Sequence, residues 1–388
     1  MLAEADCGAN LFPLPMPRVA IILSGFSADD HDPCIPVIRN FVGHLAGHAE
    51  VVVYALHYPF RRGTWRAAGA TVVGLSNRKL HGPARLMLWQ RLRRHIAAAH
   101  AARPFQLVHA FWATEPGFLA SRIAQQFGIP SVVSVAGGEF AALSQFGYGA
   151  QRTRRGRWIV ADTLRRATAV TAGSRWVAEL APPHHRRRIL PMPLGVELGA
   201  FAPASLRTGK RVLIASSMIP LKDYPTMLRA VAIARVRLPE LQLEVAGTGT
   251  EMERVRRMAF DAGLADSTNF LGFVPDDEMP RVFQRCDLLL HGSHYEAQGM
   301  VVIEALATGM PVVATSVGIA AELPPNLVRQ VHPGNAEQMA AALVDSFSSD
   351  AHAAQALHAG PELVRQQFSV GKVGADFLNL YKEVSRVE

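Results

Sequence analysis

The sequence has little of what marks several common protein classes. Its 388 residues include three cysteines, Cys7, Cys34 and Cys286, which lie far apart and lack the spacing of a metal or redox motif. No apolar run approaches the ~18 residues of a membrane-spanning helix. Residues 1–17 lack the basic start and the apolar stretch of a secretory signal. These absences argue against a disulfide scaffold and an integral membrane protein, and they predict a cytoplasmic location.

Motifs of cofactor and metal chemistry are also missing. The sequence contains no Walker P-loop and no G-x-S-x-G elbow, and no D-x-D motif follows an expected strand. The Gly-Thr-Gly run at 247–249 lacks the third glycine of a nicotinamide site. His184, His185, His291 and His294 lack partners at metal-ligand spacing and are interpreted as surface or loop residues. We therefore expect neither a cofactor nor a metal ion.

Length and composition favour two globular domains. The chain is longer than one hydrophobic core usually serves, and its 49% hydrophobic and 19% charged residues argue against disorder. Apolar runs alternate with amphipathic segments, which is typical of parallel sheets covered by helices on both faces. Expected strands are 19–23, 51–56, 106–109, 130–135, 169–172, 211–215, 241–246, 268–270, 288–291 and 311–314. We predict an α/β protein with two doubly wound, Rossmann-like domains that bind ligands at the carboxyl ends of strands.

A segment rich in proline and glycine separates the two halves of this pattern. Such a composition is typical of a linker or hinge. We place a first domain at residues 1–190, a linker at 191–203 and a second domain at 204–367. Residues 368–388 are expected to form a helix that packs back on the first domain.

Charge is distributed unevenly along the chain. The first 200 residues hold 23 Arg and Lys against 11 Asp and Glu, whereas the remainder holds 17 against 21. Arginines cluster at 61–62, 91–94, 152–157 and 186–188, and we assign Arg61, Arg62, Arg152, Arg154 and Arg155 to an anion-binding surface. Because arginine pairs with phosphate through two hydrogen bonds, an anionic acceptor or surface is one interpretation, and a solvated basic face is the other. We expect no nucleic-acid partner.

Residues 86–96 form a further basic and apolar segment. As a helix they would carry Leu, Trp and Ile beside Arg91, Arg93 and Arg94. Helices of this kind lie on anionic membranes, but a core-facing helix with a basic exposed side has the same composition. We favour the core-facing helix and keep peripheral contact with the inner face of an anionic membrane as an alternative.

The most specific pattern runs from residue 293 to residue 322. An expected strand is followed by a loop and by a helix that begins near Gly299. Free N–H groups at a helix start suit a diphosphate, and glycine permits close approach of the backbone. Glu296 precedes the helix and Glu304 lies about one turn inside it. Both carboxylates can therefore flank one ligand and accept hydrogen bonds from its hydroxyls.

This pattern resembles the E-x7-E motif of glycosyltransferase family 4, and matches in the same order cover most of residues 190–325. The resemblance implies a GT-B fold, in which Glu296 contacts the donor sugar and Glu304 the ribose of the nucleotide. It also implies that the backbone around the helix start holds the diphosphate, through Gln298, Gly299, Met300 and Val301. Family members commonly have an aromatic residue where Gln298 stands.

A second match, at 214–223, resembles the family's V-G-R-x-x-x-x-K-G element. In the family an Arg and a Lys of this element neutralise the leaving diphosphate, as glycosyl transfer requires. Lys222 keeps its position, whereas Ser217 stands in the place of the Arg. The resemblance therefore assigns Lys222 to catalysis and both residues to the donor site.

Other parts of the predicted donor site are weaker matches. Residues 269–274 resemble the strand and turn that hold the nucleotide base through main-chain atoms, which places Phe273 and Val274 there. Gly25 follows the first strand, where the family has a glycine loop that faces the donor phosphates. Gly247 is also assigned to the donor site.

The run Ala136-Gly-Gly-Glu139 departs from the family pattern, because Ala136 stands where the family often has a histidine near the reacting sugar. Glu139 stands where an acidic group is expected, and we predict that it is catalytic together with Lys222 and Glu296. The alternative is a glycine turn with a solvated Glu139.

The resemblance implies a retaining transferase that moves a hexose from a UDP- or GDP-sugar to a hydroxyl of a glycan, a lipid-linked acceptor or a small molecule. Two other hypotheses remain open at this point. One is a sugar-nucleotide epimerase or hydrolase that uses the same cleft without a separate acceptor. The other is a non-catalytic homologue, which the residues Ala136 and Ser217 favour and the intact Lys222, Glu296 and Glu304 oppose.

Overall fold

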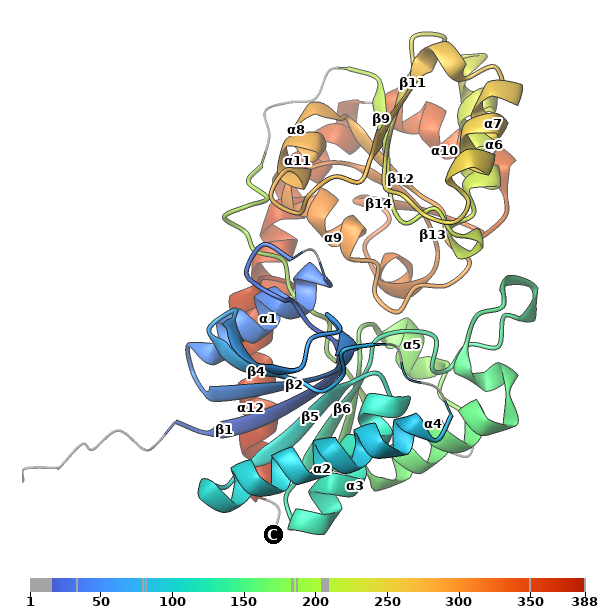
Figure 1. Ribbon diagram of the computed structural model, residues 1–388. Coiled ribbons are helices and arrows are strands. Elements are labelled where there is room, and N and C mark those ends of the chain that lie inside the picture. Colours follow the sequence, from blue (N-terminus) through green and yellow to red (C-terminus); the bar gives the residue numbers. More distant parts are fainter. Residues whose placement is uncertain are drawn as a thin grey trace, which may run out of the picture.

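The computed structural model describes residues 16–386, apart from 33, 79, 81, 183–184, 186–187, 204–208 and 349. Two sheets, each covered by helices on both faces, lie one above the other in Figure 1. The predicted fold class, α/β with two doubly wound halves, is confirmed.

The first sheet has eight strands within the described residues, in the order β3-β4-β2-β1-β5-β6-β7-β8. All neighbours are parallel except β3 and β4, which form an antiparallel edge. The strands are β1 (Arg18–Gly25), β2 (Glu50–Tyr58), β3 (Gly63–Ala67), β4 (Ala70–Gly74), β5 (Leu107–Phe111), β6 (Ser131–Val135), β7 (Ala169–Ala172) and β8 (Ile189–Pro191). Five of these strands overlap the expected ones, and β3, β4 and β8 were not predicted.

Helices cover both faces of this sheet. They are α1 (Pro36–Ala46), α2 (Ala84–Ala102), α3 (Glu115–Phe127), α4 (Arg154–Arg166) and α5 (Arg175–Glu179). Every residue of β5 and β6 is buried. Strands buried on both faces are rich in apolar residues, and the apolar residues of these two made them recognisable from the sequence.

The second sheet has six parallel strands within the described residues, in the order β11-β10-β9-β12-β13-β14. The strands are β9 (Arg211–Ala215), β10 (Gln242–Ala246), β11 (Thr268–Gly272), β12 (Leu288–His291), β13 (Val312–Thr315) and β14 (Val328–Val331). Its helices are α6 (Tyr224–Arg235), α7 (Met252–Asp261), α8 (Met279–Arg285), α9 (Met300–Ala307), α10 (Ala336–Phe347) and α11 (Asp350–Gln367). Five strands overlap the expected ones, and β14 was not predicted.

The chain crosses between the sheets twice. Strand β8 pairs with β7 up to Pro191, so the segment predicted as a linker begins inside the first sheet. Residue 204, the predicted start of the second domain, lies outside the described residues. The last helix, α12 (Val370–Arg386), returns to the first sheet, as Figure 1 shows. There the ring of Phe377 packs on Phe41 with centroids 4.8 Å apart, and Tyr381 Oη lies 2.6 Å from His109 Nδ1.

Helix α2 contains the basic and apolar segment at 86–96. Leu88, Leu92 and Ile96 are fully buried, which confirms the favoured interpretation of a core-facing helix. Leu86 and Met87 are instead 54% and 61% exposed. The helix therefore has both a core face and an apolar exposed end.

Candidate functional site

The loop between β12 and α9 carries the motif residues. Gly299 is the N-cap of α9 and has a φ of 94°, a left-handed conformation that favours glycine. The helix begins at Met300, so the free N–H groups of its first turn point into the loop region. The sequence therefore places a glycine where the chain must turn sharply into a helix.

Glu296 lies in this loop with its carboxylate at the centre of a polar cluster. Its Oε1 atom is ion-paired with Lys222 Nζ, lies 3.1 Å from His291 Nε2 and accepts a hydrogen bond of 2.7 Å from Ser293 Oγ. Burial alone would raise the pKa of Glu296, but Lys222 and His291 outweigh it and hold that pKa below its ordinary value. Glu296 is therefore a carboxylate at neutral pH.

His291 corrects one interpretation of the sequence. It was expected at the surface or in a loop, whereas it ends strand β12 and is 3% exposed. Its contact with Glu296 makes it part of the candidate site. Neither His291 nor Ser293 was predicted to take part, although both lie within five residues of the first motif glutamate.

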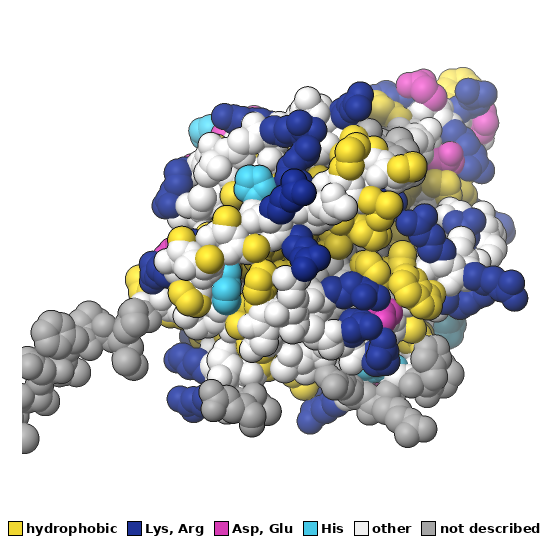
Figure 2. Space-filling view, turned by 60° about the horizontal axis from the view of Figure 1, so that its bottom comes forward, with side chains coloured by type: hydrophobic (Ala, Val, Ile, Leu, Met, Phe, Trp, Pro, Cys, Tyr) yellow, Lys and Arg dark blue, Asp and Glu magenta, His cyan; other side chains and the backbone are white. Residues whose placement is uncertain are grey.

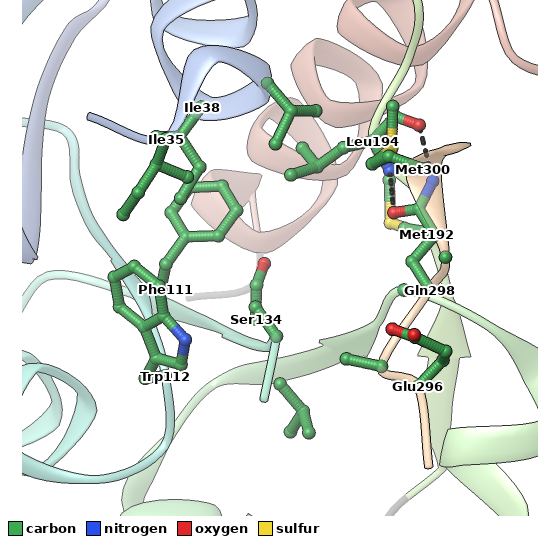
Figure 3. A pocket seen from close by; sticks show the side chains of 16 residues that line it. Ile35, Ile38, Phe111, Trp112, Ser134, Met192, Leu194, Glu296, Gln298 and Met300 are labelled. Atoms are coloured by element: carbon green, nitrogen blue, oxygen red, sulfur yellow. Dashed lines mark hydrogen bonds between the residues drawn. The ribbon is translucent and has the colours of Figure 1, made fainter. Parts of the chain in front are cut away.

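A cavity of about 220 Å³ lies beside Glu296, between the two sheets. Figure 3 shows apolar side chains of the first half, among them Ile38, Phe111 and Trp112, opposite Glu296 and Gln298. Trp112 directly follows β5 and has a φ of 71°, a conformation uncommon for a residue with a side chain. Such backbone conformations cluster at functional sites. We call this space the Glu296 cavity.

A second cavity, of about 150 Å³, adjoins the first. Glu304 and Asp276 line it, and Val37 and Met300 line both cavities. Burial, followed by the charge of Asp276, raises the pKa of Glu304 to about 8. The two motif glutamates thus flank Met300 in adjacent cavities, one as a carboxylate and the other largely protonated.

Asp276 also joins the two halves of the molecule. Arg39 of α1 donates a hydrogen bond of 3.1 Å from Nη2 to Asp276 Oδ2, in the loop between β11 and α8. This ion pair places the guanidinium of Arg39, which belongs to the first half of the molecule, beside Asp276 at the cavity of Glu304. It could not be found by reading motifs, because Arg39 lies 237 residues from its partner.

The loop of Glu296 makes further contacts across the molecule. Tyr295 Oη donates a hydrogen bond of 2.9 Å to the carbonyl of Gly137, in the loop after β6. The side-chain amide of Gln298 pairs with the backbone of Leu194 at both ends, at 2.8 Å for N–H to Oε1 and 2.7 Å for Nε2–H to O. Figure 3 shows both bonds as dashed lines. Gln298 therefore joins the motif loop to the connecting segment.

Other residues assigned to the donor site lie around these cavities without lining them. Ser217, after β9, is exposed, and Phe273 is 58% exposed beside the half-buried Val274. Gly247 has a φ of 133°, and a side chain there would collide with the carbonyl oxygen of Ser216. Within the described residues, no hydrogen bond or ion pair joins these side chains to Glu296 or Lys222.

Gly25 has a structural reason for lacking a side chain. A Cβ atom at Gly25 would lie 2.8 Å from Tyr58 Cβ, closer than such atoms pack. Gly25 thus allows β1 to end against Tyr58 of β2.

Glu139 differs from the solvated residue that the sequence offered as the alternative to catalysis. It is 1% exposed, and its carboxylate accepts hydrogen bonds from three backbone N–H groups, those of Gly137 at 2.7 Å, Ala113 at 3.0 Å and Ala136 at 3.3 Å. Burial raises the pKa of Glu139, and these N–H groups act in the opposite direction. The geometry favours a role in holding the loops after β5 and β6.

The predicted anion-binding arginines lie in two places. Arg61 stacks on the ring of Trp65 at 5.0 Å, next to Arg62 and the edge strand β3. Arg152 bonds to the carbonyl of Gly147, whereas Arg154 and Arg155 begin helix α4 and are exposed. The two groups are separate, and neither lines the Glu296 cavity.

The described residues show neither of two features, a metal-holding cluster and a membrane-spanning helix. No group of three or more His, Cys, Asp or Glu side chains is arranged to hold a metal ion in that part of the chain. None of the helices described is long and apolar enough to cross a membrane.

Two family descriptions match the chain. Residues 35–195 match the family described as "Glycosyl transferase 4-like domain", and residues 201–360 match "Glycosyl transferases group 1". The matches meet at the connecting segment, so the second covers the second sheet and the first covers the strands of the first sheet that follow β1.

Curated relatives match part of the chain. A GDP-mannose-dependent alpha-(1-6)-phosphatidylinositol monomannoside mannosyltransferase of Mycolicibacterium smegmatis is 32% identical over 34% of this chain and 39% of its own length. A mannosylfructose-phosphate synthase of Agrobacterium fabrum is 30% identical over 34% of this chain and 33% of its own. The matched region thus spans 33–39% of the length of these relatives.

Solved structures match almost the whole chain. Sucrose-phosphate synthase from Thermosynechococcus elongatus superposes with a TM-score of 0.77 at 18% identity, over 96% of this chain and all of that one. The Anabaena protein HepE, solved in complex with UDP and glucose, superposes with a TM-score of 0.73 at 17% identity, over 95% and 100%. These likenesses confirm the expected arrangement of two facing Rossmann-like domains.

Proposed function

Because the chain belongs to the GT-B glycosyltransferases of family 4, we propose that it transfers a hexose from a nucleotide diphosphate sugar to an acceptor hydroxyl. The Mycolicibacterium relative is by name a GDP-mannose-dependent mannosyltransferase, and HepE was solved with UDP and glucose. In this proposal the donor occupies the second half of the molecule. The acceptor enters from the first half.

One observation carries the proposal. Lys222 and Glu296 come from different loops of the second sheet and meet directly before the start of α9. A cation, a carboxylate and the free N–H groups of a helix start are what a diphosphate sugar needs at one point. Glu304, one turn into α9, adds an acceptor for ribose hydroxyls.

The proposed roles follow from the charges. Lys222 leaves its ion pair in part and neutralises the diphosphate, on which negative charge grows as the glycosidic bond breaks. The α9 amides share this task, because Ser217 stands where the family has an arginine. Glu296 accepts hydrogen bonds from sugar hydroxyls and stays ionised, since Lys222 and His291 hold its pKa low.

We propose retention of the anomeric configuration. Glu139 is enclosed by backbone N–H groups, and the carboxylate of Glu296 is engaged by three donors, so neither is presented as a free nucleophile. A front-face reaction, in which the donor's phosphate helps to deprotonate the acceptor, agrees with this geometry.

The experiment is a transfer assay followed by proton NMR. UDP-glucose and GDP-mannose are each incubated with the protein and a panel of sugar, inositol and lipid acceptors, and the anomeric proton of the product is observed. Retention in a new glycoside supports the proposal. Donor turnover that needs no acceptor would favour the epimerase or hydrolase hypothesis instead.

We also propose peripheral contact with an anionic membrane. Figure 2 shows Lys and Arg side chains together with exposed hydrophobic ones over one face of the first half, with few acidic groups among them. Leu86, Met87 and Trp158 are each more than half exposed, and Arg154 and Arg155 lie close to Trp158 on α4. Cosedimentation with phosphatidylglycerol vesicles, compared with phosphatidylcholine vesicles, tests this contact, and equal binding to both would contradict it.

A further inference from the structure

A third cavity, of about 280 Å³, lies in the first half of the molecule and is separate from the two cavities of the motif glutamates. It is bounded by Ser24 of β1 and by the starts of α2, α3 and α4. Since β1 is parallel to its neighbours, these elements meet at the carboxyl edge of the first sheet. We call this space the Arg155 cavity, after the arginine of α4 that lines it.

A buried carboxylate holds one arginine in place at this cavity. Glu115 is contacted by Arg85 at 2.6 Å and 3.1 Å, by Trp89 Nε1 at 2.6 Å and by His57 Nε2 at 3.0 Å. Its side chain is 10% exposed. Although burial acts in the opposite direction, these contacts lower the pKa of Glu115 to about 2, so it remains ionised. Two N–H groups of Arg85 bond to Glu115. The guanidinium has further N–H groups that can donate to a ligand.

The second arginine of the cavity, Arg155, lies on helix α4. Arg155 is exposed, and it forms no hydrogen bond or ion pair with any residue that the structure describes. The lining includes two guanidinium groups, of Arg85 and Arg155, and one carboxylate, of Glu115, so it carries one excess positive charge. Thr114 adds a hydroxyl that caps no helix N–H group.

We propose that the Arg155 cavity binds an anionic group of the acceptor, with a phosphate monoester or diester as the chemical class. The planar guanidinium groups of Arg85 and Arg155 match the oxygens of a phosphate, and the hydroxyl of Thr114 donates to one more. The cavity is large enough for a phosphate with part of the group that it esterifies.

The loop between β5 and α3 connects this cavity with the candidate reaction site. Trp112 lines the Glu296 cavity, and Thr114, two residues on, lines the Arg155 cavity. A phosphate held by Arg155 thus sits on one side of this loop and the donor sugar on the other. The assignment to an acceptor rests on the proposed function, whereas anion binding by the cavity does not.

The test compares two charge reversals on the same helix turn. Arg155→Glu changes the cavity, and Arg157→Glu is the matched control, because Arg157 is an exposed residue of α4 that does not line it. The full chain is titrated calorimetrically with inorganic phosphate, glucose 6-phosphate and glucose. Vesicles of phosphatidylglycerol and of phosphatidylcholine form a second arm, since a phosphate can come from a soluble molecule or from a lipid.

We expect saturable binding of phosphate compounds and none of glucose. Arg155→Glu weakens this binding at least tenfold, and Arg157→Glu changes it less than twofold. If the soluble phosphates do not bind, a selective loss of phosphatidylglycerol vesicle binding in Arg155→Glu supports a lipid source. Equal behaviour of the two variants in both arms overturns the proposal.

A separate titration with UDP-glucose and GDP-mannose keeps the two proposals apart. If the protein binds a donor but no phosphate compound, the proposed function is retained and the anion-binding role of the Arg155 cavity is rejected. Phosphate binding that depends on Arg155, in a protein that binds no nucleotide sugar, keeps the anion site and removes its assignment to an acceptor.

Discussion

Lys222 and Glu296 form an ion pair across 74 residues of sequence. The two side chains are 18% and 12% exposed, so little water screens them. In a protein without donor, each neutralises the other. A diphosphate sugar offers each a new partner, because the diphosphate attracts Lys222 and the sugar hydroxyls donate to Glu296. Donor binding is thus expected to exchange one internal ion pair for two contacts with the ligand.

Glu296→Gln tests this exchange. The substitution keeps the size of the side chain and removes its charge, so we expect the kcat of transfer to fall by about 10²-fold or more. Lys222 loses its partner, and the free energy of unfolding in urea falls by about 1–3 kcal/mol. In the double variant Lys222→Met/Glu296→Gln, stability recovers and activity does not. An unchanged kcat in Glu296→Gln would remove this residue from the reaction.

Glu304 predicts a pH dependence of donor binding. Its pKa of about 8 means that it is largely protonated at neutral pH, whereas ribose hydroxyls are best accepted by the ionised form. The Kd for a nucleotide sugar should therefore decrease by about tenfold between pH 6.5 and pH 8.5, because binding then costs less deprotonation. Calorimetry at several pH values measures this. Glu304→Gln is the control, and its Kd should be independent of pH in that range.

The raised pKa of Glu304 also predicts that the stability of the fold decreases as the pH rises, whereas donor binding becomes tighter. Its folded pKa lies above the ordinary value of 4.5, so its contribution to stability is complete below pH 4.5 and is lost as the pH rises through about 8. The wild-type protein should lose more unfolding free energy between pH 6 and pH 9 than Glu304→Gln does. Parallel urea curves for the two proteins across this range would contradict the raised pKa.

Gln298 is expected to act on the connecting segment. Gln298→Ala removes both hydrogen bonds to the backbone of Leu194 and leaves a buried N–H and C=O without these partners. We expect a loss of about 1–3 kcal/mol in the free energy of unfolding. Gln298→Glu keeps the acceptor for the Leu194 N–H and loses the donor to the Leu194 carbonyl. Its loss of unfolding free energy should therefore decrease at low pH, where the protonated carboxyl can donate again. A change in neither variant would mean that the pairing contributes no stability.

Variants of Glu139 can distinguish a catalytic role of this residue from a structural one. Its three backbone hydrogen bonds predict that Glu139→Ala lowers the free energy of unfolding by about 2–4 kcal/mol, because three N–H groups lose a charged acceptor. Glu139→Gln keeps one acceptor oxygen and should lose less. If Glu139 is instead a general base, both variants lose kcat equally with unchanged stability. Urea unfolding and kcat are measured on the same preparations.

The sequence predicted the strands that are buried on both faces. The runs at 19–23 and 288–290 are continuous and apolar, since each strand is covered by helices on both sides. Strands β3 and β14 were missed because Gly-Thr-Trp-Arg-Ala and Val-Arg-Gln-Val mix polar and apolar residues, as strands at or near the edge of a sheet can. Strand β8 was missed because proline at its end suggested a linker.

The sequence also predicted which residues gather at the start of α9, through the spacing of a family motif. It did not predict the partners of these residues. His291 and Ser293 contact Glu296 only because the loop folds back on itself, and Arg39 contacts Asp276 from the other half of the chain. The role of Glu139 depends on which way its carboxylate points, and no spacing encodes that direction. Contacts between distant segments had to come from the structure.

The central claim is that a nucleotide diphosphate sugar binds at the start of α9. Isothermal titration of the wild-type protein and of Glu304→Ala with UDP-glucose, GDP-mannose and ADP-glucose tests it most directly. We expect at least one of these donors to bind the wild-type protein saturably, and Glu304→Ala to weaken this binding by about tenfold or more. Binding of none of the three, or equal binding to both proteins, would contradict it.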